Sequence, residues 1–93
     1  MEEAGRALIG PSSTNLKKVT IAFTKPFSGI PVIAANTLQT DPAYPPASIP
    51  DTYAVSVTGV TSAQFTANIV RVDAPGHNGW GQKLSLGWTA TTP

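Results

Sequence analysis

Residues 73–83, DAPGHNGWGQK, contain the densest group of side chains that could do chemistry. They include the single histidine, one of the two tryptophans and three of the eight glycines. A sugar site needs an aromatic face that covers the apolar side of a pyranose, together with planar donors and acceptors for its hydroxyls. Trp80 would supply the face, and the glycines would let a ligand approach the backbone closely. The hydrogen-bonding side chains of this candidate site are Asp73, His77, Asn78 and Gln82.

The same stretch has a plainer interpretation. A glycine-rich loop between two strands is ordinary, and Trp80 could fold back onto the sheet or pack against a neighbouring protomer. Arg71 lies just before the loop, near the end of an apolar strand face. We expect it to pair with Asp73, with Asp51 or with a neighbouring protomer rather than with a ligand.

The inventory of reactive side chains argues against an enzyme. The chain has one histidine and five carboxylates, of which Glu2 and Glu3 lie at the N-terminus. Asp73 and His77 could form part of a catalytic triad, but nothing places a serine beside them, and no nucleophile elbow or P-loop is present. With no cysteine, one histidine and a single acid in the loop, we predict neither a metal site nor a cofactor.

Length and charge favour self-association. A chain of 93 residues forms a single domain with a modest core, and it has no cysteine for a disulfide. The net charge is +1 and charged residues make up only 12% of the chain, without a basic stripe for nucleic acid. A surface this poor in charge indicates coverage by other copies of the chain or by a larger particle or carrier protein.

The N-terminal sequence MEEAGRALIG is acidic and lacks a long apolar run, so we expect no signal peptide. No stretch approaches the eighteen apolar residues of a membrane span, so we expect no membrane insertion. A virion surface, or an extracellular location reached by a non-classical route, fits these features best.

Nine prolines and eight glycines exclude long helices, and the segments between them alternate between apolar and polar residues. Residues 1–5 are expected to form a flexible tail. Residues 40–51 hold four prolines and are expected to form an extended loop, with Tyr44 as a plug beneath it. The predicted strands cover residues 6–9, 17–24, 30–39, 52–60, 64–72 and 83–92.

These strands predict an all-β fold, a six-stranded antiparallel β-sandwich. Residues 52–60 and 64–72 should form a hairpin joined by a short turn. Trp88 alternates with Leu84 and Leu86 and is therefore expected in the core, and Tyr53 is expected to face the core by the same rule.

The order and spacing of several short pieces resemble the H-type lectin domain of snail agglutinins and of the C-terminal part of discoidins. The matching pieces are Ile21-Ala22-Phe23, Pro26-Phe27, Pro31-Val32-Ile33, Val55 to Val60, Phe65-Thr66 and Trp88-Thr89-Ala90. The resemblance covers residues 6–91, so the whole chain would be one such domain. It implies a sandwich that assembles as a homotrimer and binds galactose-type or N-acetylgalactosamine-type sugars between protomers.

The sugar-binding positions of that family carry different residues here. Ser12 stands where the family has an acid. The family's arginine corresponds to a position near Thr52, where this chain has no arginine. Val72-Asp73 stands where the family has a Trp-His or Trp-Tyr pair. The loop after these residues is also longer, and its side chains could supply replacements.

Two functions follow from these features. The first is a trimeric, lectin-like carbohydrate-binding domain for cell adhesion, whose weak sites lie at protomer interfaces and gain avidity from the assembly. Each site would combine the 73–82 loop of one protomer with the N-terminal or proline-rich loop of another. The alternative is a small trimeric structural, decoration or receptor-binding tip protein of a virus particle, with no retained sugar site. A third possibility is an interaction domain that binds protein through an apolar patch.

Overall fold

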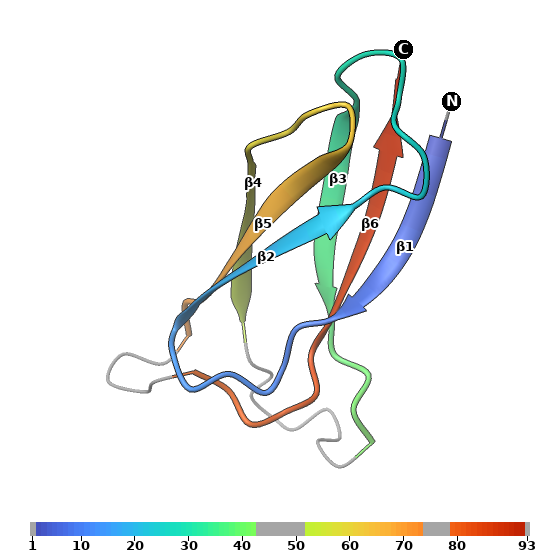
Figure 1. Ribbon diagram of the computed structural model, residues 1–93. Helices are drawn as coiled ribbons and strands as arrows, with labels where there is room; N and C mark the ends of the chain where they lie inside the picture. Colours follow the sequence, from blue (N-terminus) through green and yellow to red (C-terminus); the bar gives the residue numbers. More distant parts are fainter. Residues whose placement is uncertain (1, 43–51, 74–78, 93) are drawn as a thin grey trace.

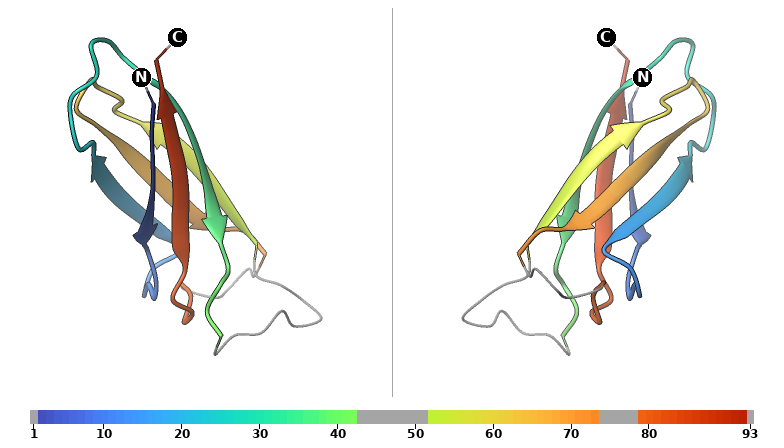
Figure 2. Two further views of the ribbon diagram at one scale, coloured as in Figure 1. Left: turned by 90° about the vertical axis from the view of Figure 1, so that its right-hand side faces the viewer. Right: turned by 90° about the vertical axis from the view of Figure 1, so that its left-hand side faces the viewer.

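The computed structural model describes residues 2–42, 52–73 and 79–92, and this part of the chain is entirely β-structure, as predicted. Its strands are β1 (Glu2–Leu8), β2 (Leu16–Ala22), β3 (Val32–Leu38), β4 (Tyr53–Thr58), β5 (Gln64–Arg71) and β6 (Ser85–Thr91). They form two three-stranded antiparallel sheets with the orders β1-β6-β3 and β2-β5-β4. The predicted six-stranded antiparallel sandwich is therefore confirmed. The two sheets lie face to face, with β6 and β5 as their central strands (Figures 1 and 2).

Strand β1 begins earlier than the sequence predicted. Residues 2–5 are not a flexible tail, because they pair with β6 from Glu2 opposite Thr91 to Gly5 opposite Trp88. Gly5, which reads as a strand breaker, is required for packing: a Cβ placed there would lie 2.6 Å from the Trp88 ring. The start of β1 and the end of β6 therefore lie at the same end of the fold (Figure 1).

An acid on the inner side of β1 fixes the strand to the opposite sheet. The carboxylate of Glu3 accepts hydrogen bonds from the backbone N–H of Thr24, at 3.0 and 3.1 Å, and from the Thr24 hydroxyl at 3.2 Å. Thr24 lies just after β2, so this contact ties the start of the chain to the second sheet. A charged residue that looks like part of a solvated tail is thus a structural link.

The core is a cluster of aromatic rings between the sheets. Trp88 of β6 packs edge-on against Phe65 of β5 with ring centroids 5.5 Å apart, and Phe23 lies 5.8 Å from Trp88. Phe27 meets Phe23 edge-on at 4.9 Å. Burying one such side chain contributes about 1.5–3 kcal/mol, so these rings supply much of the stability of a small domain. The core position predicted for Trp88 is confirmed, and Tyr53 packs partly buried against the same core.

The predicted hairpin between β4 and β5 is also confirmed. Thr61 closes its turn: the Thr61 N–H donates to the carbonyl oxygen of Gln64 at 2.8 Å, and the Thr61 hydroxyl accepts from the N–H groups of Ala63 and Gln64 at 3.1 Å. The turn also contacts the segment after β2, because Phe27 donates its N–H to the Ser62 carbonyl at 2.7 Å. This end of the sandwich is thus closed by backbone hydrogen bonds between the β2–β3 and β4–β5 connections.

The packing of Gly5 against Trp88 predicts that a glycine-to-alanine substitution destabilises the protein at position 5 but not at position 29. Gly5→Ala should lower the free energy of unfolding by about 1–3 kcal/mol, because the added methyl group overlaps the indole ring. Gly29→Ala should stay within about 0.5 kcal/mol of the parent protein, since no atom lies within 4 Å of its added Cβ. Urea unfolding of the two variants measures the difference, and equal effects would contradict the packing role of Gly5.

Candidate functional site

The loops at the end of the sandwich opposite the chain ends are joined by paired backbone hydrogen bonds. Ser12 donates its N–H to the carbonyl of Trp80 at 3.0 Å, and Trp80 donates its N–H to the carbonyl of Ser12 at 2.9 Å. Gly79 permits this close approach: its φ is +75°, and a Cβ there would collide with the Ser12 carbonyl oxygen. The loop before β2 and the segment before β6 therefore form one unit.

Trp80 is buried by this arrangement. Only 3% of its surface is exposed, and its ring packs edge-to-face on Tyr53, with centroids 5.3 Å apart. Trp80 thus folds back onto the sandwich, which is the plainer of the two interpretations of the sequence. Its ring face cannot serve as the pyranose platform that the sequence suggested. The indole N–H lies beside Gly10 and has no hydrogen-bond partner among the described residues.

Gln82 is buried in the same region, with 3% of its surface exposed. Its side-chain amide donates hydrogen bonds to the side-chain oxygen of Gln39 at 3.2 Å and to the hydroxyl of Tyr53 at 3.1 Å. The next residue, Lys83, donates its N–H to the carboxylate of Asp41 at 2.8 Å. Gln82 and its neighbour therefore hold the chain that leaves β3 against the segment before β6.

Asp73 is held by an ion pair. Its carboxylate lies 3.1 Å from Nε of Arg71 and 3.3 Å from Nη2, and it accepts the N–H of Thr52 at 2.9 Å. Nη1 of Arg71 donates to the carbonyl of Gly79 at 3.0 Å. The Arg71–Asp73 pairing predicted from the sequence is confirmed. The hydrogen bonds from Arg71, and then the one from Thr52, lower the pKa of Asp73 from 3.8 to about 2.

Asn15 connects the two halves of this end. Its side-chain oxygen accepts the N–H of Gly79 at 2.6 Å, and its backbone carbonyl accepts the N–H of Arg71 at 3.1 Å. Asn15 was not singled out from the sequence, because a polar residue before a strand is common and its partners lie more than fifty positions away. Together, Asn15, Arg71, Asp73, Gly79 and Trp80 form a polar clasp, the name used below for these five residues.

The five candidate sugar-binding residues thus lie in different surroundings. Asp73 and Trp80 belong to the polar clasp, and Gln82 is buried beside it. His77 and Asn78 lie outside the described residues, as do Tyr44 and Asp51, so their predicted roles stay predictions. Among the residues described, no three His, Asp or Glu side chains gather where they could hold a metal ion. Within the described ranges no helix is long and apolar enough to span a membrane.

A second candidate surface is the outward-facing side of the sheet β1-β6-β3, called the β6 face below. It is formed by Glu2, Ala4, Arg6 and Leu8 of β1, Ser85, Gly87, Thr89 and Thr91 of β6, and Val32, Ala34, Asn36 and Leu38 of β3. Its two charges both lie on β1, at one edge. Apolar side chains are exposed on both edges, with 66% of Leu8 and 67% of Val32 accessible to solvent.

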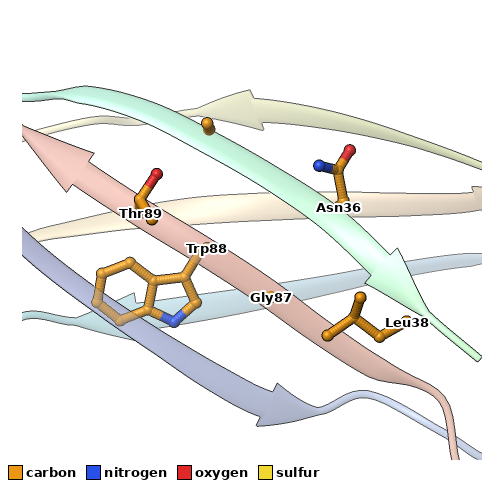
Figure 3. A pocket seen from close by; sticks show the side chains of 6 residues that line it. Asn36, Leu38, Gly87, Trp88 and Thr89 are labelled. Atoms are coloured by element: carbon orange, nitrogen blue, oxygen red, sulfur yellow. The ribbon is translucent and has the colours of Figure 1, made fainter. Parts of the chain in front are cut away.

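The β6 face has an open depression over strands β6 and β3, with a volume of about 210 Å³. It is lined by Ala34, Asn36, Leu38, Gly87, Trp88 and Thr89 (Figure 3). The depression exists because Gly87 has no side chain on the central strand. Leu38 leans over the vacant position, where a Cβ on Gly87 would lie 3.0 Å from its methyl carbon.

The outward side of the other sheet, β2-β5-β4, exposes Leu16 and carries the charge of Lys18. Its side chains bond to one another: the hydroxyls of Thr20 and Thr66 lie 3.3 Å apart, and the amide of Asn68 donates to the hydroxyl of Thr58 at 3.0 Å. Hydroxyls and amides that are already paired and still exposed suit contact with water. We call this surface the threonine face.

Comparison with known proteins identifies the fold but no family. No protein-family model matches the chain, and no curated protein matches it. Among solved structures, the chain is similar to the tailspike gp61 of the Pseudomonas phage phi297, with a TM-score of 0.71 and 16% identity. The match covers 100% of this chain and 15% of the tailspike chain. Identity this low shows a shared fold alone, and the resemblance to H-type lectins stays a prediction.

The lowered pKa of Asp73 predicts a pH-dependent contribution of the polar clasp to stability. A carboxyl whose pKa falls on folding stabilises the native state above its unfolded pKa of 3.8, and the contribution is lost as pH falls towards 2. Asp73→Asn should therefore lower the free energy of unfolding at pH 7 by about 1 kcal/mol, allowing for solvent screening of a partly exposed pair.

Urea unfolding of Asp73→Asn and of the parent protein, from pH 7 to pH 2, measures this effect. The difference between the two proteins should shrink below pH 4 and disappear near pH 2. A difference that stays constant over this range would show that the ion pair with Arg71 does not set the contribution.

Proposed function

We propose that the chain is a non-enzymatic, self-associating module of a virus particle, of the kind that forms part of a tail spike or a receptor-binding tip. The observation that carries this proposal is the likeness of its whole length to part of a phage tailspike. The chain spans 15% of that tailspike's length. It would therefore supply one folded unit of a larger assembly, and the rest of the assembly would supply other activities.

The polar clasp supports a structural role for the loop end of the sandwich. Asp73 is the only carboxylate of the predicted sugar-binding loop, and it is engaged by Arg71 and Thr52. With a pKa of about 2 it is also a poor general base at neutral pH. Trp80 and Gln82 are buried. Three of the five side chains that could have recognised a sugar are thus used to shape the loops.

The β6 face supports self-association. We propose that the outer side of this sheet, which exposes Leu8 and Val32, is covered in the assembled protein. Assembly would also stabilise a domain of 93 residues that has no disulfide. We propose a homotrimer, the state that the H-type lectin resemblance implies and that closed cyclic symmetry permits.

The first experiment measures the mass of the purified protein by analytical ultracentrifugation over a wide concentration range. We expect a species of three times the chain mass of 9.6 kDa. A monomer at every concentration would contradict the proposed self-association. An antibody raised against the chain should also label spikes or tips of virus particles in negative-stain electron microscopy, and unlabelled particles would contradict the proposed location.

A glycan array tests the carbohydrate-binding alternative in parallel. We expect no binding by the parent protein, because Trp80 offers no exposed face. Binding that is lost in His77→Ala or Asn78→Ala, in variants that keep the parent mass, would favour a lectin instead. Trp80→Ala is unsuitable for this purpose, because removing a buried ring should cost about 3–5 kcal/mol of stability.

A further inference from the structure

We propose that Glu3 and Lys17 prevent strands of other chains from pairing with the free edges of the sandwich. Each is a charged residue on the inner side of an edge strand, Glu3 on β1 and Lys17 on β2. The inference goes beyond the proposed function, because it concerns which surfaces of the unit must stay unpaired rather than what the unit is part of.

The sandwich has one long side on which its strand edges are open. The sheet orders leave β1, β3, β2 and β4 with one partner strand each. Strands β3 and β4 approach each other along one side, whereas β1 and β2, along the other, are more widely separated (Figure 2). Among the described residues, no backbone hydrogen bond joins β1 to β2. We call this second side the open side; its unpaired N–H and C=O groups are a template for an added strand.

Inward-facing charge follows the open side. The inward residues of its two strands are Glu3, Gly5 and Ala7 of β1 and Lys17, Val19 and Ile21 of β2. The inward residues of the strands on the other side are Ile33, Ala35 and Thr37 of β3 and Tyr53, Val55 and Val57 of β4. Of the four edge strands, only the two on the open side therefore have a charge facing inward.

Glu3 and Lys17 lie at opposite ends of the open side. Glu3 pairs with Ala90 near the chain ends, and Lys17 pairs with Ile69 near the loop end. The inward residues between them are small or apolar. Without the two charges, each strand would present an uninterrupted row of such residues beside unpaired backbone groups, which is the pattern that promotes strand addition.

An added strand would have to cover these charges. Both residues are half-buried, and at a free edge a lysine can extend its ammonium group to water. A strand paired with β2 would enclose the ammonium group of Lys17, and burial of an unpaired charge costs more than a backbone hydrogen bond contributes. Glu3 is fixed at the edge of β1, because its carboxylate accepts the hydrogen bonds from Thr24.

The sequence supplies a matched control for each charge. Glu2 precedes Glu3 and Lys18 follows Lys17, and both of these neighbours face outward on the same strands. Substitution of either member of a pair changes the net charge and the strand propensity by the same amount. Only substitution of the inward member should expose the edge to pairing.

The test compares Lys17→Val with Lys18→Val in native buffer, by thioflavin T fluorescence and light scattering. Lys17→Val should aggregate about tenfold faster, because it completes an apolar row along the free edge of β2. Its urea midpoint should be at least that of Lys18→Val, since valine favours a strand. Equal aggregation rates, or faster aggregation of Lys18→Val, would overturn the inference.

A further variant separates the charge of Lys17 from its packing. Lys17→Glu keeps a charge at the edge and loses the aliphatic stem of lysine, and its net charge has the same magnitude as that of the parent. It should stay as soluble as the parent protein. If Lys17→Glu aggregates as fast as Lys17→Val, the charge does not protect the edge, and the inference is wrong.

The comparison on β1 uses Glu3→Gln and Glu2→Gln. The amide oxygen introduced at position 3 can still accept hydrogen bonds from Thr24, so β1 should stay in place while its inward charge is removed. Glu3→Gln should aggregate faster than Glu2→Gln, and equal rates would contradict the inference for β1. The mass of the parent protein, which tests the proposed self-association, does not enter these comparisons, so either proposal can fail alone.

Discussion

The edge-on contact between Trp88 and Phe65 joins the central strands of the two sheets, and the rest of the fold depends on it. Each sheet has only three strands, so neither can bury its inner side without the other. The ring of Trp88 also determines its neighbour on β1, since it occupies the space that a side chain on Gly5 would need. The inner side of the sandwich is thus filled by a few aromatic rings, and polar groups are left for the outer sides and the loop end.

The loop end shows how a small domain uses side chains that could have served a ligand. Arg71 and Asp73 neutralise each other, Asn15 and Arg71 both contact Gly79, and Trp80 packs inward on Tyr53. These contacts join segments that are far apart in the sequence, so they order loops that no disulfide or metal constrains in the described chain. The loop end is thus ordered by contacts between distant segments, whereas the outer side of the sheet β1-β6-β3 has its two charges on one edge strand.

Alternation of apolar and polar residues predicted β2, β4, β5 and β6 and the core position of Trp88, because period-two patterning is a local property of a half-buried strand. Strand β3 was predicted instead from a largely apolar run that follows Pro31. Neither pattern predicted residues 2–5, where Gly5 and two glutamates resemble a tail; only the position of the Trp88 ring explains the glycine. The burial of Trp80 could not be predicted from local sequence either, since it depends on Ser12, sixty-eight positions earlier. Asn15 and Gln82 are similar cases: their partners are set by the tertiary fold, and local composition has no information about them.

The pairing of Glu2 with Thr91 has a mechanical consequence. The first and last strands lie side by side and antiparallel, so a force that separates the two chain ends would peel β1 from β6 one hydrogen bond at a time. A force between the chain ends and the loop end would instead run along the strands. The hydrogen bonds of an antiparallel ladder lie perpendicular to that direction, so they would be loaded together in shear. A domain held at its chain ends and pulled at its polar clasp is therefore loaded in its strong direction.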